Sequence, residues 1–177
     1  FNVDNELEVK AGIESLANEL GGIDILVNNA GVGDFGSIEE MPSETWEQVI
    51  KTNLFGVYYT AKAVYPFLKE KGQGDIVNVA STAGLKGGPN MSAYAASKAA
   101  VVSLSQSMLA EWRKQNIRVI TLTPSTIASE MSINGGLTDG NPDKVLQPED
   151  FAEWVRDILK MNRRAMIANA SIFSTNP

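Results

Sequence analysis

Hydrophobic residues recur every three or four positions in several stretches of the chain, which is the spacing of one face of an α-helix. In the first stretch, Gly21 and Gly22 follow the last regularly spaced position and indicate the end of the helix. Its hydrophobic positions are Val9, Ile13, Leu16 and Leu20. We expect further helices over residues 43–70, over the Ala- and Ser-rich residues 91–114, and from Pro148 onward.

Short apolar runs lie between these helices and predict buried β-strands. The runs are residues 23–27, 75–80 and 117–122, with a weaker one at 165–173, whereas residues 124–147 are typical of a mobile loop. Strands that alternate with helices predict an α/β fold with a parallel sheet covered on both faces. In such sheets the ligand site lies beyond the carboxyl ends of the strands. The residues expected to line it are Asn28–Gly31, Ser81 and Pro124.

Composition narrows the function classes. The 177 residues carry a net charge of −6 without a long run of one sign, which argues against nucleic acids and anionic membranes as partners. The chain contains neither cysteine nor histidine, so disulfides, His- or Cys-based metal sites and Ser-His-Asp hydrolysis are excluded. We expect no metal site. No apolar run approaches the ~20 residues of a membrane span and no signal peptide is visible, so we expect a cytoplasmic protein.

Tyr94 and Lys98 form the most informative pair of polar residues. They are four positions apart in a predicted helix, so their side chains lie on one face about one turn apart. An ammonium beside a phenol lowers the pKa of the phenol from about 10, which lets it exchange a proton near neutral pH. The same spacing also arises by chance, as a packed ring beside a solvated charge.

Three further motifs are ambiguous on their own. The small residues of Asn28–Gly31 allow a ligand to approach the backbone closely, but they also suit an ordinary turn. Asn53 interrupts an apolar helix face and needs partners such as a backbone carbonyl or water, whether its role is structural or functional. Ser81 can donate a hydrogen bond to a substrate or cap a turn.

Taken together and in this order, these motifs resemble the short-chain dehydrogenase/reductase family. Asn28-Asn29-Ala30-Gly31 follows one strand, Asn53 lies in the next helix, Ser81 ends the next strand, and Tyr94 and Lys98 follow. The resemblance covers essentially the whole chain. It implies a Rossmann-like, doubly wound parallel sheet and NAD(P)-dependent dehydrogenase chemistry.

The resemblance also implies catalytic roles. Tyr94 would protonate the carbonyl oxygen during reduction, and Lys98 would lower the pKa of Tyr94 and hydrogen-bond the nicotinamide ribose. Ser81 would orient the substrate carbonyl. Asn53 would hold the helix backbone and a water that relays protons to Lys98.

The cofactor contacts implied by the resemblance are spread along the chain. Besides Tyr94 and Lys98, the expected cofactor-binding residues are Asn2, Val3, Asn29, Ala30, Gly31, Pro124, Ser125 and Ile127. NADP(H) is favoured over NAD(H), although the sequence does not decide this preference. Ser125 stands where the family usually has glycine, and fits if its φ is negative. Asn2 stands where many members have aspartate, which is a mild departure.

A larger departure concerns the start of the chain. The family opens with a Gly-rich phosphate loop, and no Gly-x-x-x-Gly-x-Gly occurs here. Two strand–helix units of roughly 60 residues in all have no counterpart. We therefore expect residues 1–177 to form a single domain that is the carboxyl-terminal part of a longer one. Its first strand would have a bare edge, and these residues alone should fold poorly and bind cofactor weakly.

The chain most resembles 3-oxoacyl-carrier-protein reductases, so the expected function is reduction of a ketone. The alternatives are a non-catalytic NAD(P)-binding regulator on the same fold and an epimerase or dehydratase. Residues 127–147 would cover a small carbonyl, alcohol or acyl substrate. Met131, Ile133 and Leu137 suggest an apolar or mixed substrate there, or equally serve loop packing.

Assembly is expected through the helices at 43–70 and 91–114, which pair across dimer interfaces in the family, often within tetramers. These helices carry more hydrophobic residues than are needed to cover one face of the sheet, among them Leu104, Met108 and Trp112. The alternative is that these residues cover the sheet. We expect a homodimer or homotetramer.

Overall fold

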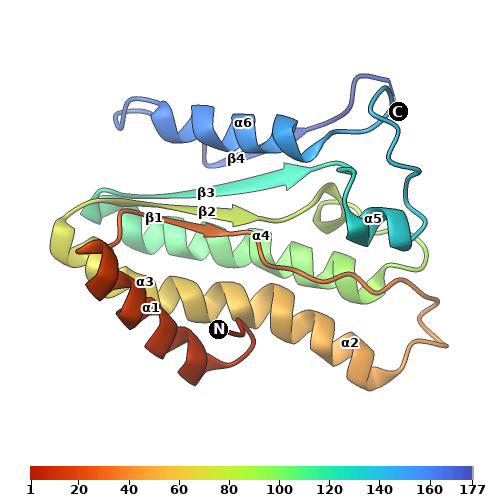
Figure 1. Cartoon of the computed structure of the whole chain (residues 1–177), viewed down its shortest axis with the longest axis horizontal. Coiled ribbons are helices and arrows are strands. Elements are labelled where there is room, and N and C mark those ends of the chain that lie inside the picture. The colour runs from red at the N-terminus through yellow and green to blue at the C-terminus, as the bar shows by residue number, and fades with distance from the viewer. Residues whose placement is uncertain (177) are drawn as a thin grey trace.

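The computed structural model describes residues 1–176, so Pro177, the last residue of the predicted domain, lies outside the described residues. Helices and strands alternate through most of it (Figure 1). The strands are β1 (Ile25–Asn28), β2 (Gly74–Val79), β3 (Ile117–Pro124) and β4 (Asn169–Ile172). The helices are α1 (Glu6–Leu20), α2 (Ser43–Ile50), α3 (Gly56–Lys71), α4 (Ser92–Trp112), α5 (Glu130–Asn134) and α6 (Pro148–Lys160).

The four strands form one parallel sheet in the order β1-β2-β3-β4. Val27 of β1 lies opposite Val77 of β2, which lies opposite Ile120 of β3. Strands β2 and β3 are buried along their whole length, which explains their continuous hydrophobic character. The predicted α/β parallel sheet is confirmed, and β1 is an edge strand as expected.

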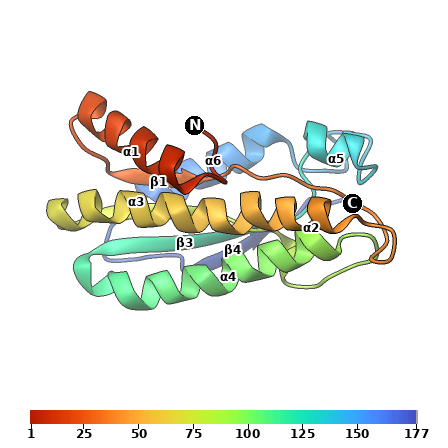
Figure 2. The same cartoon turned by 90° about the horizontal axis from the view of Figure 1, so that it is seen from below.

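Helices cover both faces of this sheet, so the doubly wound arrangement is also confirmed (Figures 1 and 2). Helices α1, α3 and α4 pack on one face around a core that includes Val64, Ile76 and Val101. Helix α6 covers the other face, where Ile158 packs with the side chains of β2 and β3. None of the helices within residues 1–176 has the length and apolar character that crossing a membrane requires.

Helix α1 shows where simple periodicity misplaces the buried face. Val9, Ile13 and Ala17 are buried, whereas Leu16 and Leu20 are 41% and 71% exposed. Positions four apart stay on one face, and the small Ala17 continues that face where the helix approaches its neighbours closely. The helical spacing of Leu16 and Leu20 therefore does not mean that they are buried.

The carboxyl-terminal third contains more regular structure than the sequence suggests. The predicted loop at 124–147 includes the short helix α5, which Ser129 caps through the backbone N–H of Ser132. The same segment is closed by a β-bridge between Ile127 and Leu146. This geometry gives the segment a defined position beside the carboxyl ends of the strands.

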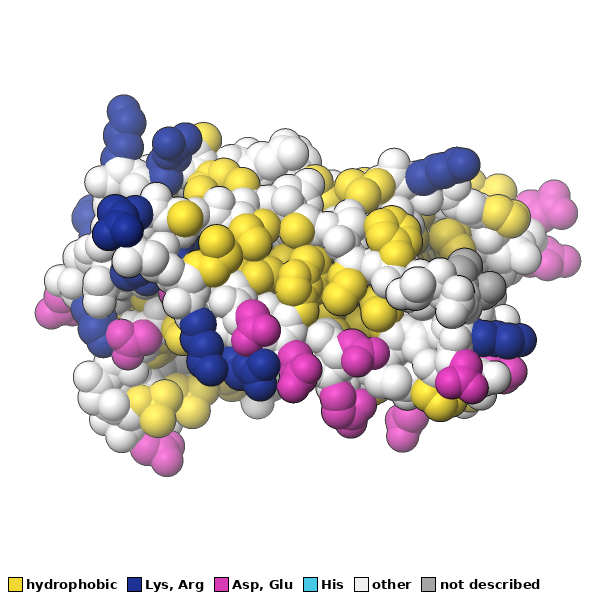
Figure 3. All heavy atoms as spheres, turned by 90° about the horizontal axis from the view of Figure 1, so that it is seen from above, with side chains coloured by type: hydrophobic (Ala, Val, Ile, Leu, Met, Phe, Trp, Pro, Cys, Tyr) yellow, Lys and Arg dark blue, Asp and Glu magenta, His cyan; other side chains and the backbone are white. Residues whose placement is uncertain are grey.

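One face of β1 remains uncovered. Leu26 and Asn28 face α3, and because strand side chains alternate, Ile25 and Val27 face the opposite side. Ile25 and Val27 are 47% and 43% exposed, because α6 covers β2 and β3 instead. Figure 3 shows hydrophobic side chains gathered across the middle of the face seen from the α6 side.

Two buried asparagines tie the helices to the sheet. Asn28 donates to Asn78 on the neighbouring strand at 2.8 Å and accepts from Thr60 of α3 at 2.7 Å. Asn78 in turn donates to Ser105 of α4 at 2.8 Å. The Asn28 side chain therefore orients α3 and α4 across the sheet, rather than the loop that follows β1.

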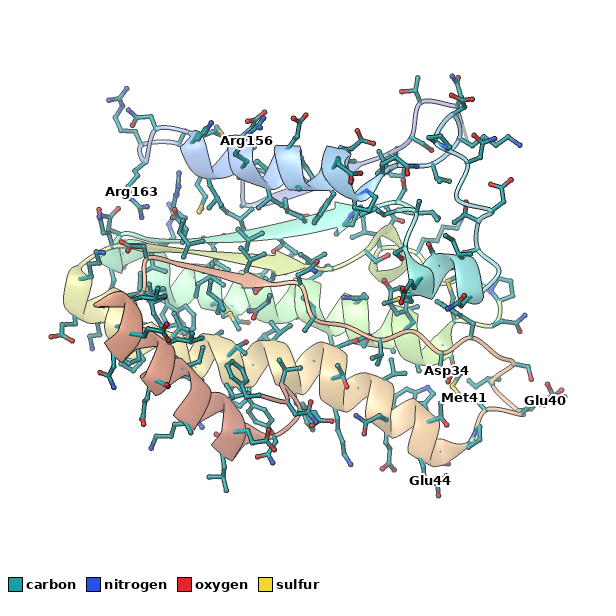
Figure 4. The ribbon with its side chains drawn as sticks, in the orientation of Figure 1. Asp34, Glu40, Met41, Glu44, Arg156 and Arg163 are labelled. Atoms are coloured by element: carbon teal, nitrogen blue, oxygen red, sulfur yellow. The ribbon has the colours of Figure 1, made fainter. Side chains whose placement is uncertain are left out.

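A buried ionic cluster lies at the opposite end of the sheet from the carboxyl ends of the strands. Both carboxylate oxygens of Asp75 accept from Arg118, each at 2.7 Å, and Asp75 also accepts from Arg163 at 2.9 Å. Arg118 donates further to the carbonyls of Leu159 and Met161 at the end of α6. Figure 4 shows Arg163 reaching toward the sheet from the loop after α6. The cluster therefore fastens α6 to the start of β2 and β3.

Candidate active site

A large cavity, with a volume of about 1320 Å³, lies where the strands end. The ends of all four strands or the loops that follow them contribute to its wall, together with α4, α5 and α6. The wall includes the predicted site residues Asn29, Gly31, Ser81, Tyr94, Lys98, Pro124, Ser125 and Ile127. The structure therefore brings together residues that are almost 100 positions apart in the sequence.

Tyr94 and Lys98 lie on the face of α4 that borders this cavity. The Nζ atom of Lys98 lies over the Tyr94 ring, 5.7 Å from its centroid, and donates to the carbonyl of Val79 at 2.9 Å. Lys98 is 5% exposed. The carbonyl of Val79 at the end of β2 thus holds the ammonium in place over the tyrosine ring.

Burial dominates the acidity of both groups. Removal from water lowers the pKa of Lys98 from 10.5 to about 8, since burial disfavours the charged form. Burial raises the pKa of Tyr94 for the same reason, and the Ser81 side chain opposes that rise. The expectation that Lys98 lowers the pKa of Tyr94 below its ordinary value was wrong for this structure. The reason is that the ammonium is directed to the Val79 carbonyl rather than to the phenol oxygen.

Ser81 combines the two roles that the sequence left open. Its Oγ accepts from the backbone N–H of Ala83 at 3.1 Å and so caps the short 3-10 turn Thr82–Gly84. Its side chain also lies close enough to Tyr94 to oppose the rise in the pKa of the phenol. The cap orients a hydroxyl group that lies beside the phenol.

Asn53 lies in a π-helical turn, Lys51–Phe55, between α2 and α3. Its Oδ1 accepts from the backbone N–H of Val32 at 2.8 Å, and its Nδ2 donates to the carbonyl of Val32 at 2.9 Å. The Nδ2 also donates to Ser97 of α4 at 3.0 Å. The expectation that Asn53 holds the helix backbone was wrong, because this side chain holds the loop that follows β1.

Two glycines allow neighbouring segments to pack closely around the site. A Cβ at Gly31 would lie 3.2 Å from Oδ1 of Asn53 and 3.5 Å from Nζ of Lys98. A Cβ at Gly84 would lie 2.6 Å from a backbone carbon of Lys98, so α4 could not approach the 3-10 turn as closely. The absence of these side chains lets the loops after β1 and β2 approach the Tyr94–Lys98 pair.

The part of the cavity near β3 fits a polar ligand. Within the described chain, the Ser125 hydroxyl is buried without a hydrogen-bond partner, so a ligand group can pair with it. Ser125 has no positive φ, as the sequence argument required. The glycine cradle at Gly31 and this unpaired hydroxyl both suit a nucleotide cofactor lying along the strand ends.

Three predicted cofactor residues lie apart from the cavity wall that the described residues form. Asn2 and Val3 precede α1, where the backbone N–H of Asn2 donates to Glu8 and the Val3 side chain contacts Gly56. Ala30 is absent from the wall, while Asn29 and Gly31 on either side of it contribute. Their roles toward a cofactor stay predictions.

Sequence reasoning missed several hydrophobic residues of the cavity. Phe35, Phe151, Val155 and Phe173 line it, and Met131 and Leu137 of the predicted covering loop do so as well. Ile133, the third hydrophobic residue singled out there, is 46% exposed and lies beside Gly140. An aromatic residue soon after a strand end was the one available signal for Phe35, but it does not distinguish a cavity wall from loop packing.

Comparison with known proteins identifies the family. The model of the short chain dehydrogenase family matches residues 1–139. The chain belongs to the short chain dehydrogenase family. The inactive 2-(S)-hydroxypropyl-CoM dehydrogenase 2 of Xanthobacter autotrophicus is 37% identical over 172 residues, which cover 97% of this chain and 74% of that relative.

Two further family members extend the comparison. The 3-oxoacyl-(acyl-carrier-protein) reductase of Thermotoga maritima is also 37% identical, over 132 residues that cover 75% of this chain and 54% of that protein. An alcohol dehydrogenase from the archaeon Thermococcus sibiricus, solved with 5-hydroxy-NADP, is 27% identical with a TM-score of 0.90. That similarity covers 100% of this chain and 74% of the solved chain. This chain therefore spans about half to three quarters of the length of these relatives.

The lowered pKa of Lys98 predicts how stability depends on pH. Between pH 8 and 10 the unfolded chain binds more protons at Lys98 than the folded chain, so stability rises with pH in this window. A shift from 10.5 to about 8 corresponds to a gain of about 2 kcal/mol between about pH 8 and about pH 10. Urea unfolding of wild type and Lys98→Met at several pH values measures this difference. Parallel pH profiles for the two proteins would contradict it.

Proposed function

We propose that the protein transfers a hydride between NAD(P)H and a ketone or the corresponding secondary alcohol. The observation that carries this proposal is the meeting of Tyr94, Lys98 and Ser81 in one large cavity where the parallel strands end. The glycine cradle at Gly31 and the unpaired Ser125 hydroxyl support a bound nicotinamide cofactor. The neighbours' dehydrogenase and reductase names support the same reaction class.

In this proposal the protein supplies binding, orientation and the proton, and bound NAD(P)H supplies the hydride. Ser81 donates a hydrogen bond to the substrate carbonyl oxygen and places it beside Tyr94. The Tyr94 hydroxyl then gives its proton to that oxygen as the carbonyl carbon is reduced. Reversal of the same transfer makes Tyr94 the base for alcohol oxidation.

Lys98 and Asn53 support this proton transfer. With a pKa of about 8, Lys98 is mostly charged at neutral pH, and its ammonium, held by the Val79 carbonyl, is placed to hydrogen-bond the nicotinamide ribose beside Tyr94. Asn53 holds Val32 and Ser97, which fixes the loop after β1 against α4. We assign Asn53 a positioning role next to the Tyr94–Lys98 pair.

For the cofactor we propose contacts by Asn29, Gly31, Lys98, Pro124, Ser125 and Ile127, with Asn2, Val3 and Ala30 as further predicted contacts. A nicotinamide cofactor is supported by the NADP analogue in the solved relative. We keep the preference for NADP(H) over NAD(H) as a prediction. Cofactor titrations followed by nicotinamide fluorescence would compare the two.

For the substrate we propose a small ketone of the kind reduced by 3-oxoacyl-carrier-protein reductases. The apolar side chains of Phe151, Val155 and Leu137 in the cavity suit an acyl chain. The inactive hydroxypropyl-CoM dehydrogenase homologue has the same 37% identity, so identity alone does not rank the substrates.

A cofactor-oxidation assay on the full-length protein tests this proposal. The protein is mixed with NADPH or NADH and a panel of 3-oxoacyl thioesters and simple ketones, and absorbance of the reduced cofactor is followed. We expect turnover with at least one 3-oxo substrate. Tight cofactor binding without turnover of any carbonyl compound would contradict it.

The second candidate is a non-catalytic NAD(P)-binding protein on the same fold. One observation favours it, because a relative that aligns with 97% of this chain is itself described as inactive. The presence of Asn53, Ser81, Tyr94 and Lys98 in one site favours catalysis here. Epimerase or dehydratase chemistry is a third option, and product analysis by mass would separate it from reduction.

Three further properties of the protein are proposals. We propose that residues 1–177 form a single domain and that the protein is cytoplasmic. We also propose a homodimer or homotetramer that assembles through helices 43–70 and 91–114. Part of the reasoning for assembly was wrong, because Met108 is 5% exposed and Leu104 and Trp112 pack against the core. The exposed Phe55 and Tyr58 of the first helical segment are better candidates for an interface.

A further inference from the structure

A second hollow adjoins the active-site cavity. It has a volume of about 510 Å³ and lies between α5 and the loop that follows β1. Figure 4 shows Asp34, one of its lining residues, on that loop near α5. Gly31, Phe35 and Met131 line both spaces. Because glycine has no side chain, the side chains of Phe35 and Met131 must form the wall between them.

The two side chains converge on one point. A Cβ added at Gly33 would lie 2.9 Å from Sδ of Met131 and 2.9 Å from Cζ of Phe35. The thioether and the tip of the ring therefore both pack over Gly33, although they come from segments almost 100 residues apart. Gly33 itself lines the second hollow, so the two side chains meet at the boundary of that hollow.

Phe35 is the rigid half of this wall. Asn53 holds the backbone at Val32, and the N–H of Gly36 donates to the carbonyl of Asn90 at 2.8 Å. The Phe35 ring packs against the Tyr94 ring at a centroid distance of 5.7 Å and an angle of 58°. The backbone on both sides and the ring itself are thus fixed.

Met131 is the adaptable half. It lies on the short helix α5, and methionine is unbranched and changes its conformation more readily than a ring does. The hollow behind the wall also has polar lining residues, Asp34 and Asn134. A carboxylate and an amide there accept hydrogen bonds from hydroxyl groups.

We propose that Phe35 and Met131 determine the substrate size on this side of the carbonyl, and that the hollow behind them takes a hydroxylated branch once the wall is shortened. This inference rests on the proposed ketone reduction. In the wild type the wall confines the substrate to a compact substituent next to Tyr94. Shortening either side chain joins the two spaces and brings Asp34 and Asn134 within reach of the branch.

The test uses a methyl ketone that the wild-type protein reduces and the same ketone carrying a dihydroxypropyl branch next to the carbonyl. Met131→Ala is expected to raise the ratio of kcat/KM for the branched over the compact ketone by about tenfold or more. Phe35→Ala is expected to raise the ratio similarly and also to lower kcat, because it removes the ring that packs on Tyr94.

Ile133→Ala is the matched control. Ile133 lies on the same helix α5 as Met131, is 46% exposed, and lines neither of the two spaces that the described residues form. Its truncation is expected to leave the ratio unchanged. Equal ratios in wild type, Met131→Ala and Phe35→Ala would overturn the proposal, as would an equal rise in Ile133→Ala.

Binding separates this inference from the proposed reaction. Calorimetric titration of the two corresponding secondary alcohols, with oxidised cofactor present, measures the affinity ratio without turnover. A wild-type protein that reduces no ketone overturns the proposed function, while a raised affinity for the branched alcohol in Met131→Ala still supports the wall. An unchanged ratio of the affinities for the two alcohols would overturn the proposed role of Phe35 and Met131, even if the protein turns over a ketone.

Discussion

Tyr94→Phe is expected to lower ketone turnover by about 10²–10⁴-fold, because it removes the group that gives the proton to the carbonyl oxygen. The ring remains, so its packing on Phe35 at 5.7 Å and the shape of the cavity should be kept. Lys98 keeps its hydrogen bond to Val79, which preserves the expected cofactor contact. Steady-state cofactor oxidation measures the loss, and cofactor fluorescence measures binding.

Tyr58→Phe provides the matched control for Tyr94→Phe. Tyr58 lies on α3, 42% exposed, and belongs to no part of the cavity wall that residues 1–176 form. Its loss of a hydroxyl group should leave turnover unaltered. Wild-type turnover in Tyr94→Phe would refute the assigned role, and a loss of cofactor binding together with turnover would indicate a structural role instead.

Asp75→Asn is expected to destabilise the fold by about 3–5 kcal/mol, because it leaves the buried guanidinium of Arg118 without its counter-ion. Asp75 and Arg118 are each 5% exposed and share two hydrogen bonds of 2.7 Å. The Asp75 carboxylate raises the pKa of Arg118 in the wild type, and without it Arg118 still stays charged at neutral pH, because the ordinary pKa of arginine lies far above 7. Urea unfolding at neutral pH measures the change.

Two further variants show whether the buried charge is the cause. In Glu6→Gln the lost partner is Lys62, and both side chains are about half exposed, so stability should change far less. The double variant Asp75→Leu with Arg118→Met removes both charges and should recover much of the stability lost in Asp75→Asn. A loss as large in the double variant as in Asp75→Asn would contradict the electrostatic explanation.

Local patterns predicted the order of helices and strands, because each pattern depends on neighbours within a few residues. The runs at 75–80 and 117–122 are continuous in hydrophobic character, and they became the two central strands. Of the weaker run at 165–173, only Asn169–Ile172 forms a strand, since an edge strand is buried along less of its length. Helix α5 was missed because five residues show no periodicity.

The polar residues show a second limit of prediction from the sequence. The strand ends indicated that Asn29 and Ser81 belong to one site, because strand ends of a parallel sheet meet at one edge, and the family resemblance added Tyr94 and Lys98. It could not indicate which way each side chain points. Asn53 bonds to Val32, 21 residues away, rather than to its own helix, and that choice depends on the path of the loop after β1.

The sequence by itself therefore determined the α/β parallel sheet and the family pattern, both of which follow from spacing along the chain, and the family resemblance predicted the residues for proton transfer. The tertiary structure decided the protonation behaviour of Tyr94 and Lys98 and the wall made by Phe35 and Met131. Both depend on burial and on contacts between distant segments, since a pKa responds to the loss of water and a cavity to the packing of side chains. The Tyr94–Lys98 spacing alone predicts neighbours on one helix face, and only the surrounding fold shows that burial moves their pKa values in opposite directions.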